Sequence, residues 1–198
     1  MRIGDSMWEA VAFWYFIASR LAYVLWVGWA LRQQDRARRF TRELGAEAGF
    51  LRFRRVASIL MNNDGVSFVV LVLVTRNTLA LEFPRWGVLI AGGLMVVAGV
   101  GIKLWAAASL GAKAYYWHNF FAPDDPIPPQ PAGPYRYVRN PMYTLGYLQT
   151  YGLALLFSSL PALIASGFAQ AAVLVFNYLV ERPHYAELMR QARAQEAS

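Results

Sequence analysis

Residues Gly133–Tyr143 (GPYRYVRNPMY) could bind an anionic group at the start of a helix. Pro141 suits the first turn of a helix, where its missing amide is not needed, and Asn140 before it is a favourable N-cap. The free amides of a helix start attract anions, and Arg136 and Arg139 place two positive charges beside them. Tyrosine and arginine are also the usual anchors of a helix at a membrane surface, so spacing alone leaves both interpretations open.

A second group of polar residues, Asn177–Glu187 (NYLVERPHYAE), follows the last apolar run. Glu181 stands at the edge of that run, with Arg182 and Pro183 directly after it. Ionisable groups near an apolar interior are costly to bury and tend to have a function. A solvated helix end is the alternative interpretation of the same acid.

The two histidines, His118 and His184, are further candidates for a base, although histidine is also common at membrane surfaces. Asp124 and Asp125 are not expected to form a metal site, because adjacent side chains point apart and prolines flank the pair. The chain has no cysteine, which excludes disulfides, thiolate metal sites and a cysteine nucleophile. No metal partner is expected.

The elements that must position these groups are strongly apolar. Of the 198 residues, 57% are hydrophobic and only 16% are charged, against about 45–50% and about 25% in soluble domains. The net charge of +7 is carried mainly by arginine, without any pattern typical of RNA or DNA binding. We therefore expect one integral membrane domain whose partner is the lipid bilayer and not a nucleic acid.

Five segments approach the length of about 20 apolar residues that a membrane-spanning helix needs: 7–31, 56–81, 86–110, 143–159 and 162–180. Charged residues interrupt the first three, among them Arg20, Asp64 and Lys103. Residues 158–161 (SSLP) predict a tight turn between the last two helices. The predicted fold class is all-α, with three N-terminal membrane helices in 7–110, a motif loop in 111–142, and a helical hairpin with a C-terminal motif in 143–191.

Arginine placement predicts the orientation in the membrane. Residues 32–55 contain eight arginines, whereas the next connection offers only Arg76 and Arg85. By the positive-inside rule the N-terminus lies outside, and the motif loop and the C-terminus are cytoplasmic. Residues 122–134 hold six of the ten prolines and predict an extended cytoplasmic loop. The first apolar segment is too long for a signal-peptide core and is interpreted as a retained helix.

Two of these motifs together resemble a family of membrane methyltransferases. Gly133–Tyr143 resembles the GPYRYVRHPMY stretch shared by isoprenylcysteine carboxyl methyltransferases and phospholipid N-methyltransferases. Glu181-Arg182-Pro183 resembles the EEP that ends the next helical hairpin in the phospholipid enzymes, and Leu110–Phe120 resembles their LG…G…L…DYFG segment. The resemblance covers about residues 104–191 and implies an S-adenosylmethionine-dependent enzyme with a cytoplasmic cofactor pocket.

The resemblance also implies which residues form the site. The implied cofactor-binding residues are Gly111, Tyr135, Arg139, Asn140, Pro141, Tyr143, Glu181 and Arg182. Arg139 or Arg136 would pair with the cofactor carboxylate, and Glu181 would take its ammonium or ribose hydroxyls. Tyr135, Tyr143 and Trp117 would border the adenine or face the sulfonium. An amine acceptor must first lose a proton, for which Glu181 and His118 are the implied catalytic residues.

The implied reaction is methyl transfer to a membrane-embedded amphiphile. The amine headgroup of a phospholipid is the favoured acceptor, because Asn140–Tyr143 and Glu181–Pro183 lie closer to the phospholipid branch. An isoprenylcysteine-type carboxyl O-methyltransferase is the alternative acting on a lipidated substrate. A non-catalytic membrane protein that retains the fold also stays open, since Arg182 replaces the second acid of the motif and Ala114 replaces its second glycine.

Overall fold

The computed structural model describes residues 3–122 and 132–196, and these residues are mainly helical, with no strand among them. The long helices are α1 (Ile3–Ala37), α3 (Ala46–Val74), α4 (Arg85–Tyr115) and α6 (Leu160–Phe176). Within the described part of the chain, four helical segments are long and apolar enough to cross a bilayer: Ser6–Ala37, Ala46–Val74, Arg85–Phe120 and Leu160–Arg190. The predicted all-α membrane fold is confirmed.

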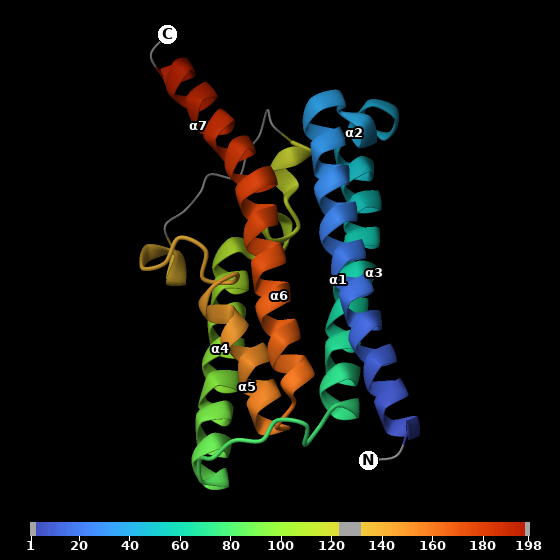
Figure 1. The fold of residues 1–198 in the computed structure, drawn as a ribbon. Coiled ribbons are helices and arrows are strands. Elements are labelled where there is room, and N and C mark those ends of the chain that lie inside the picture. Colours follow the sequence, from blue (N-terminus) through green and yellow to red (C-terminus); the bar gives the residue numbers. More distant parts are fainter. Residues whose placement is uncertain (1–2, 123–131, 197–198) are drawn as a thin grey trace.

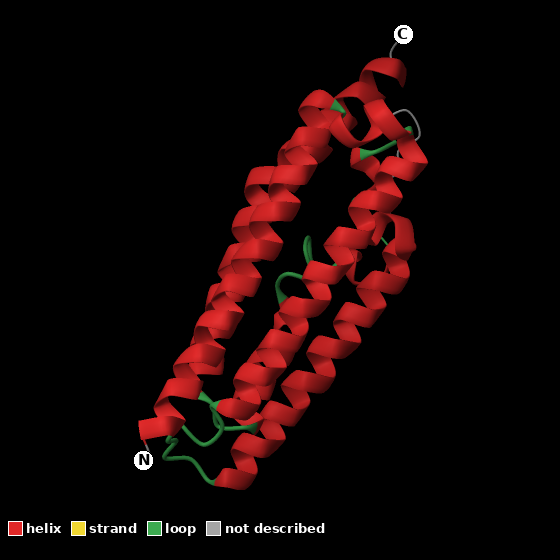
Figure 2. Cartoon of the chain, turned by 90° about the vertical axis from the view of Figure 1, so that its right-hand side faces the viewer, coloured by secondary structure: helices red, strands yellow, loops and turns green. Residues whose placement is uncertain are grey.

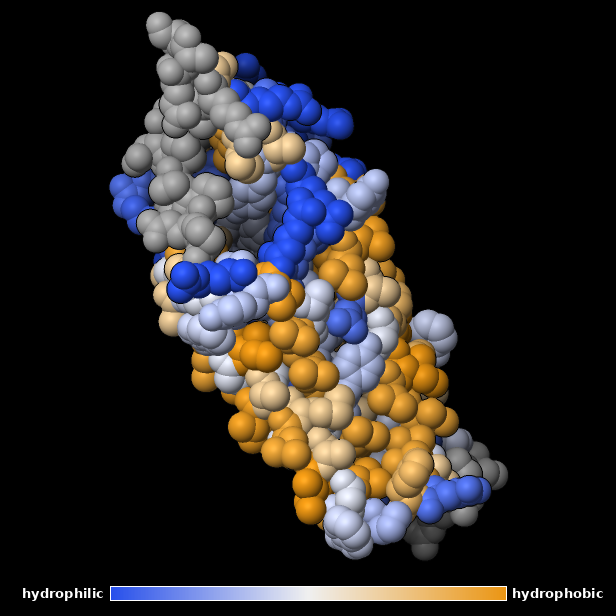
Figure 3. All heavy atoms as spheres, turned by 90° about the vertical axis from the view of Figure 1, so that its left-hand side faces the viewer, coloured by the Kyte–Doolittle hydropathy of each residue, from blue (hydrophilic) through white to orange (hydrophobic). Residues whose placement is uncertain are grey.

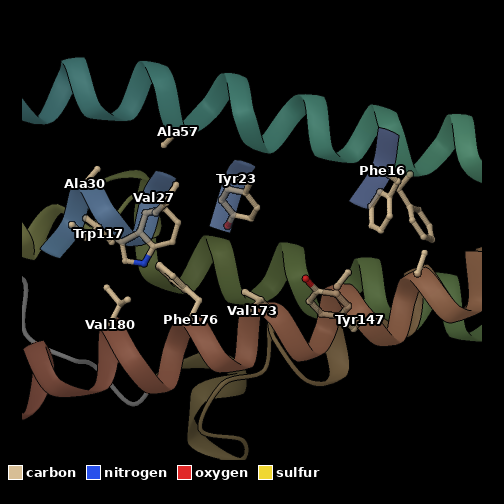
Figure 4. Packing of buried hydrophobic residues seen from close by; sticks show 14 of the residues in the cluster. Phe16, Tyr23, Val27, Ala30, Ala57, Trp117, Tyr147, Val173, Phe176 and Val180 are labelled. Carbon is tan, nitrogen blue, oxygen red and sulfur yellow. The ribbon is translucent and has the colours of Figure 1, made fainter. Parts of the chain in front are cut away.

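The helices form two groups that lie side by side (Figures 1 and 2). In one group α1 packs along α3, and in the other α4 and α6 flank the short helix α5 (Leu148–Leu156). Contacts between α1 and α6 join the groups, and Figure 4 shows Val27 and Tyr23 of α1 facing Phe176 and Val173 of α6. The face shown in Figure 3 carries a broad hydrophobic band, with hydrophilic residues gathered towards the end that bears α7 (Arg182–Glu196).

The predicted arginine-rich loop at residues 32–55 is largely helical. The helix α1 runs on to Ala37, a short helix α2 (Arg39–Leu44) follows, and α3 already begins at Ala46. The reason is amphipathic packing beyond the apolar segment, because Phe50, Phe53 and Ala57 are buried on one face of α3 while Arg52 and Arg55 are exposed. The true connections are single residues with positive φ, Arg38 (49°) and Gly45 (78°).

The helix expected to begin at Pro141 is shorter than predicted. The nine residues of α5 rise only about 14 Å, roughly half the thickness of a bilayer core. Asn140 and Pro141 lie in a turn before it, where the Asn140 carbonyl accepts from the Tyr143 and Thr144 amides at 3.1 Å each. Asn140 is therefore not the N-cap that the sequence predicts, and the turn is completed by η3 (Leu145–Tyr147).

The predicted turn between the last two helices is confirmed. The Ser159 hydroxyl caps α6 by accepting from the Ala162 amide at 3.1 Å, and Pro161 lies in the first turn. The connection after α3 is fixed to this turn by the Asn77 amide, which donates to the Phe157 carbonyl at 2.9 Å. This end of the bundle also carries the N-terminus, whereas α2, α7 and the C-terminus lie at the other end (Figure 1). Asp124, Asp125 and most of the proline-rich loop fall outside the described residues.

Candidate active site

A cavity of about 1210 Å³ lies between the α1–α3 pair and the other helices. Its walls come from α1, α3, α4, α6 and the segment Tyr135–Thr150, and continue into the first turns of α7. Six of the predicted site residues line it: Tyr135, Arg139, Asn140, Tyr143, Glu181 and Arg182. The structure thus brings together two motifs that are separated by a helical hairpin in sequence.

Glu181 is placed by a π-helical turn, η4 (Asn177–Glu181), between α6 and α7. Such turns insert one extra residue and are frequent at functional sites. The turn occurs before Pro183, which has no amide to donate to the Leu179 carbonyl four residues earlier. The guanidinium of Arg32 donates to that carbonyl at 3.3 Å and compensates for the lost bond.

The carboxylate of Glu181 is only 6% exposed and is held by three donors. The Tyr143 hydroxyl donates to Oε1 at 2.7 Å, the Trp117 indole N–H donates to the same oxygen, and the Asn177 amide donates to Oε2. Hydrogen bonds of this kind are what make a buried carboxylate tolerable. Since a carboxylate has about four acceptor positions, roughly one remains for a ligand.

A further hydrogen bond near this carboxylate connects the segment Gly133–Tyr143 to the π-helical turn. The Asn140 side-chain amide donates to Asn177 Oδ1 at 2.9 Å, so Asn140 and Tyr143 both bond to the same π-helical turn. Asn140 therefore fixes the orientation of the Asn177 amide, which in turn directs its N–H group towards Glu181. The three residues form a continuous hydrogen-bonded chain in the cavity wall.

Trp117 reaches Glu181 because α4 loses its regular form near its end. Gly111 has φ 75° and interrupts the helix, and Trp117 itself has φ 58° in the turn before η1 (His118–Phe120). A positive φ at Gly111 is permitted by the lack of Cβ. Gly111 is outside the cavity lining, although Leu110 and Ala114 on either side belong to it. Gly111 therefore allows the backbone to change direction and does not itself line the cavity.

The segment Gly133–Tyr143 lies tightly against α4. Gly133 has φ 58°, and a Cβ at this position would fall 2.0 Å from the Ser109 hydroxyl. A side chain at this position would be strained by the positive φ and would have to displace the side chain of Ser109. Pro141 is fully buried behind the cavity wall and supports Asn140 and Tyr143 without lining the cavity.

Tyr135 follows in the same segment, in η2 (Gly133–Arg136). Burial raises the pKa of the Tyr135 phenol, and the nearby Glu181 carboxylate raises it further. The phenol is therefore protonated at neutral pH and available as a hydrogen-bond donor in the cavity wall.

The structure distinguishes between the two arginines of the motif. Both arginines are exposed, but Arg139 lines the cavity whereas Arg136 lies outside the lining. Arg182 also lines it, with its guanidinium 5.6 Å from the Tyr178 ring centre. Arg139 is therefore the better placed of the two for pairing with an anionic group.

The histidines do not lie in this cavity. His118 packs edge-on against Phe50, with 4.9 Å between ring centres, and its predicted role as a catalytic base finds no support in its position. His184 stacks on Phe120 at 3.6 Å, and its Nδ1 lies 2.8 Å from a carboxylate oxygen of Asp35. Both imidazoles belong to the packing between the cavity and the α1–α2 corner.

A group of charged residues that the sequence analysis did not assign to the site lines the cavity nearer the middle of the bundle. Arg20 forms a salt bridge of 2.6 Å with Asp64 and donates to the Tyr147 hydroxyl at 3.1 Å. Lys103 lies over the Tyr147 ring, 5.1 Å from its centre. The signal for this group is present in the sequence, because Arg20, Asp64 and Lys103 each interrupt an apolar segment.

Fold and site together define a multi-pass helical membrane protein with an internal, charged binding cavity. The chain belongs to the phospholipid methyltransferase family, whose sequence model matches residues 88–192. This match covers α4, both motifs and most of α7, whereas α1 and α3 lie before it.

Similar proteins include two fungal enzymes named phosphatidylethanolamine N-methyltransferase. The one from Clavispora lusitaniae is 30% identical in an alignment of 146 residues, which covers 68% of this chain and 17% of the relative. The one from Pyricularia oryzae is 32% identical over 140 residues, or 68% of this chain and 14% of the relative. The chain thus spans less than a fifth of the length of these relatives, and no solved structure matches it.

Proposed function

We propose that this protein transfers a methyl group from S-adenosylmethionine to the amine headgroup of a membrane phospholipid. The observation that carries the proposal is the buried carboxylate of Glu181, held by donors from Trp117, Tyr143 and Asn177 in the wall of a large cavity. The names of the fungal relatives support the choice of a phospholipid amine.

The residues present suit S-adenosylmethionine. The cavity of about 1210 Å³ exceeds the range of about 300–1,000 Å³ typical of one small ligand, which leaves room for an acceptor headgroup as well. Arg139 would pair with the carboxylate of the cofactor, and Glu181 would accept a hydrogen bond from its ammonium or ribose hydroxyls. When bound, the cofactor supplies an electrophilic methyl group on a sulfonium, whose charge Tyr135 and Tyr143 would face.

The contribution of the protein is to position the reactants and exclude water. The Asn140–Asn177–Glu181 chain fixes one wall, and the packing of Gly133 on α4 fixes another. Because three hydrogen bonds fix the position of the Glu181 carboxylate, we assign it to binding rather than to removal of a proton. His118 is given no part in the reaction, since it lies outside the cavity.

The acceptor would enter from the bilayer. Asn62, Gly65 and Val69 lie on one face of α3, and all three line the cavity and are exposed. Val69, for example, is 49% exposed. We therefore assign the entrance to this face of α3, through which a headgroup would reach the cavity while its acyl chains stay among lipids.

The pH dependence of the reaction tests the nature of the acceptor. A phospholipid amine is mostly protonated at neutral pH and has no free electron pair in that form, so we expect the rate with phosphatidylethanolamine to rise with pH until the amine has titrated. Purified protein in mixed micelles, with radioactive S-adenosylmethionine, provides the measurement. A flat profile together with methylation of a prenylcysteine analogue would instead identify a carboxyl O-methyltransferase.

The orientation in the membrane is also a proposal. We infer that the motif segment faces the cytoplasm, because the arginine-rich connection from α1 to α3 lies at the same end of the bundle as α7. The chain has no native cysteine, so Arg136→Cys and Arg85→Cys each introduce a single exposed thiol. A membrane-impermeant maleimide applied to intact cells should label Arg85→Cys alone. Labelling of Arg136→Cys from outside would reverse the orientation.

A further inference from the structure

We propose that Lys103 and Arg20 bind the phosphate of the phospholipid acceptor inside the cavity. This inference rests on the proposed function, because it takes a phospholipid as the ligand of the cavity. It concerns residues to which the proposed function gives no role. Arg20 lies on α1, Asp64 on α3 and Lys103 on α4, so three helices meet at this point in the cavity wall. Arg20 and Asp64 both precede the residues that the family model matches.

The Arg20–Asp64 pair is deeply buried and incompletely satisfied. Their side chains are 9% and 8% exposed, and the salt bridge between them measures 2.6 Å. Within the part of the chain that the structure describes, neither Arg20 Nε nor Asp64 Oδ1 has a hydrogen-bond partner. Buried charged groups are normally fully hydrogen-bonded, so the protein compensates this pair only in part.

Lys103 is a cation without an anionic partner at the same place. It forms no salt bridge with any residue in 3–122 or 132–196, and the charged groups that act on it are Arg20 and Asp64. Its aliphatic part lies across Gly146, where an added Cβ would come within 2.8 Å of Lys103 Cγ. The absence of a side chain at Gly146 therefore provides the space in which Lys103 runs along the cavity.

The net charge of the cluster formed by Arg20, Asp64 and Lys103 indicates which kind of ligand it would bind. Two cations, Arg20 and Lys103, face one anion, Asp64, which leaves one positive charge in excess within an apolar band. An unpaired charge is expensive there, and a phosphodiester carries the single negative charge that would balance it.

The cluster lies next to the site around Glu181. Tyr147 bonds to Arg20, and Tyr143, four residues earlier, bonds to Glu181. Tyr23 of α1 lies between Trp117 and Tyr147 in the view of Figure 4, and both Arg20 and Glu181 act on it electrostatically. A headgroup whose phosphate is held at Lys103 would therefore lie close to the part of the cavity assigned to the cofactor.

The test measures lipid binding directly. Native mass spectrometry of the purified chain, with dioleoyl phosphatidylethanolamine and dioleoyl glycerol, compares lipids that differ in the headgroup phosphate. We expect Lys103→Met to weaken binding of the phospholipid by at least about tenfold, the effect of losing one charged hydrogen bond. Lys103→Arg should retain binding. The matched control is Lys113→Met, because Lys113 is the other lysine of the chain, is exposed and lies outside the cavity lining.

Equal binding of the two lipids by the wild type, or unchanged phospholipid binding by Lys103→Met, would overturn the inference. Methyl transfer is measured on the same preparations, so that a failure of the proposed phosphate site can be distinguished from a failure of the proposed function. Active protein whose lipid binding is independent of Lys103 contradicts the inference alone. Lys103-dependent lipid binding by a protein that methylates none of its lipids supports the inference and contradicts the proposed function. Inorganic phosphate in excess should not displace the lipid, since the acyl chains add to its binding.

Discussion

Replacing Glu181 by glutamine is expected to lower kcat/KM for methyl transfer roughly 100-fold, corresponding to about 3 kcal/mol. The substitution removes the negative charge and turns one acceptor oxygen into a donor. If the new amide group faces Asn177, two donors meet, and turning the Asn177 amide to avoid this breaks its bond from Asn140. The carboxamide therefore cannot satisfy the three donors that the carboxylate holds.

The matched control for this variant is Glu187→Gln. Glu187 lies two turns further along the same continuous helix, is exposed, and is outside the cavity lining. Its substitution should leave kcat/KM within about twofold of the wild type, as is usual for surface positions. Thermal unfolding in detergent shows whether both variants are folded. A folded Glu181→Gln protein with full activity would show that the carboxylate is only a structural element.

The second large effect is expected for Arg139→Ala. Loss of one hydrogen bond to a charged group should weaken binding of S-adenosylhomocysteine by about 1.5–3 kcal/mol, or about 10–150-fold. Arg136→Ala provides the control, because Arg136 belongs to the same motif but lies outside the cavity lining. Isothermal titration calorimetry on the three proteins gives the comparison.

Equal affinities for Arg139→Ala and the wild type would make Arg139 an anchor at the membrane surface rather than a ligand for the cofactor. A larger loss with Arg136→Ala than with Arg139→Ala would contradict the arrangement of the motif described above.

The fold class could be predicted from the sequence because long apolar segments indicate membrane-spanning helices. Their ends could not, since the helices continue into polar sequence where one face is still packed. Phe50 and Phe53 are buried, and their packing extends α3 into a region that arginine counts alone assign to a loop. The shortness of α5 depends on turns between Asn140 and Tyr147, which no apolar pattern records.

For the site, the motif residues were predictable because a resemblance to known families identified them. The distinction between Arg139 and Arg136 was not, because it depends on how Gly133 lies against α4. Trp117 as a donor to Glu181 could not be predicted either, since Gly111 and a residue with positive φ redirect the chain before it. The cluster of Arg20, Asp64 and Lys103 requires knowing that three helices face one cavity.

Mass spectrometry of membrane lipids tests the central proposal most directly. The chain and its Glu181→Gln variant are expressed at equal levels in cells that contain phosphatidylethanolamine and lack its methylated derivatives. We predict that N-methylated phosphatidylethanolamines accumulate with the wild type and are reduced roughly 100-fold with the variant. Folded wild-type protein that binds S-adenosylhomocysteine but leaves phosphatidylethanolamine unmethylated would contradict the assignment of a phospholipid amine as the acceptor.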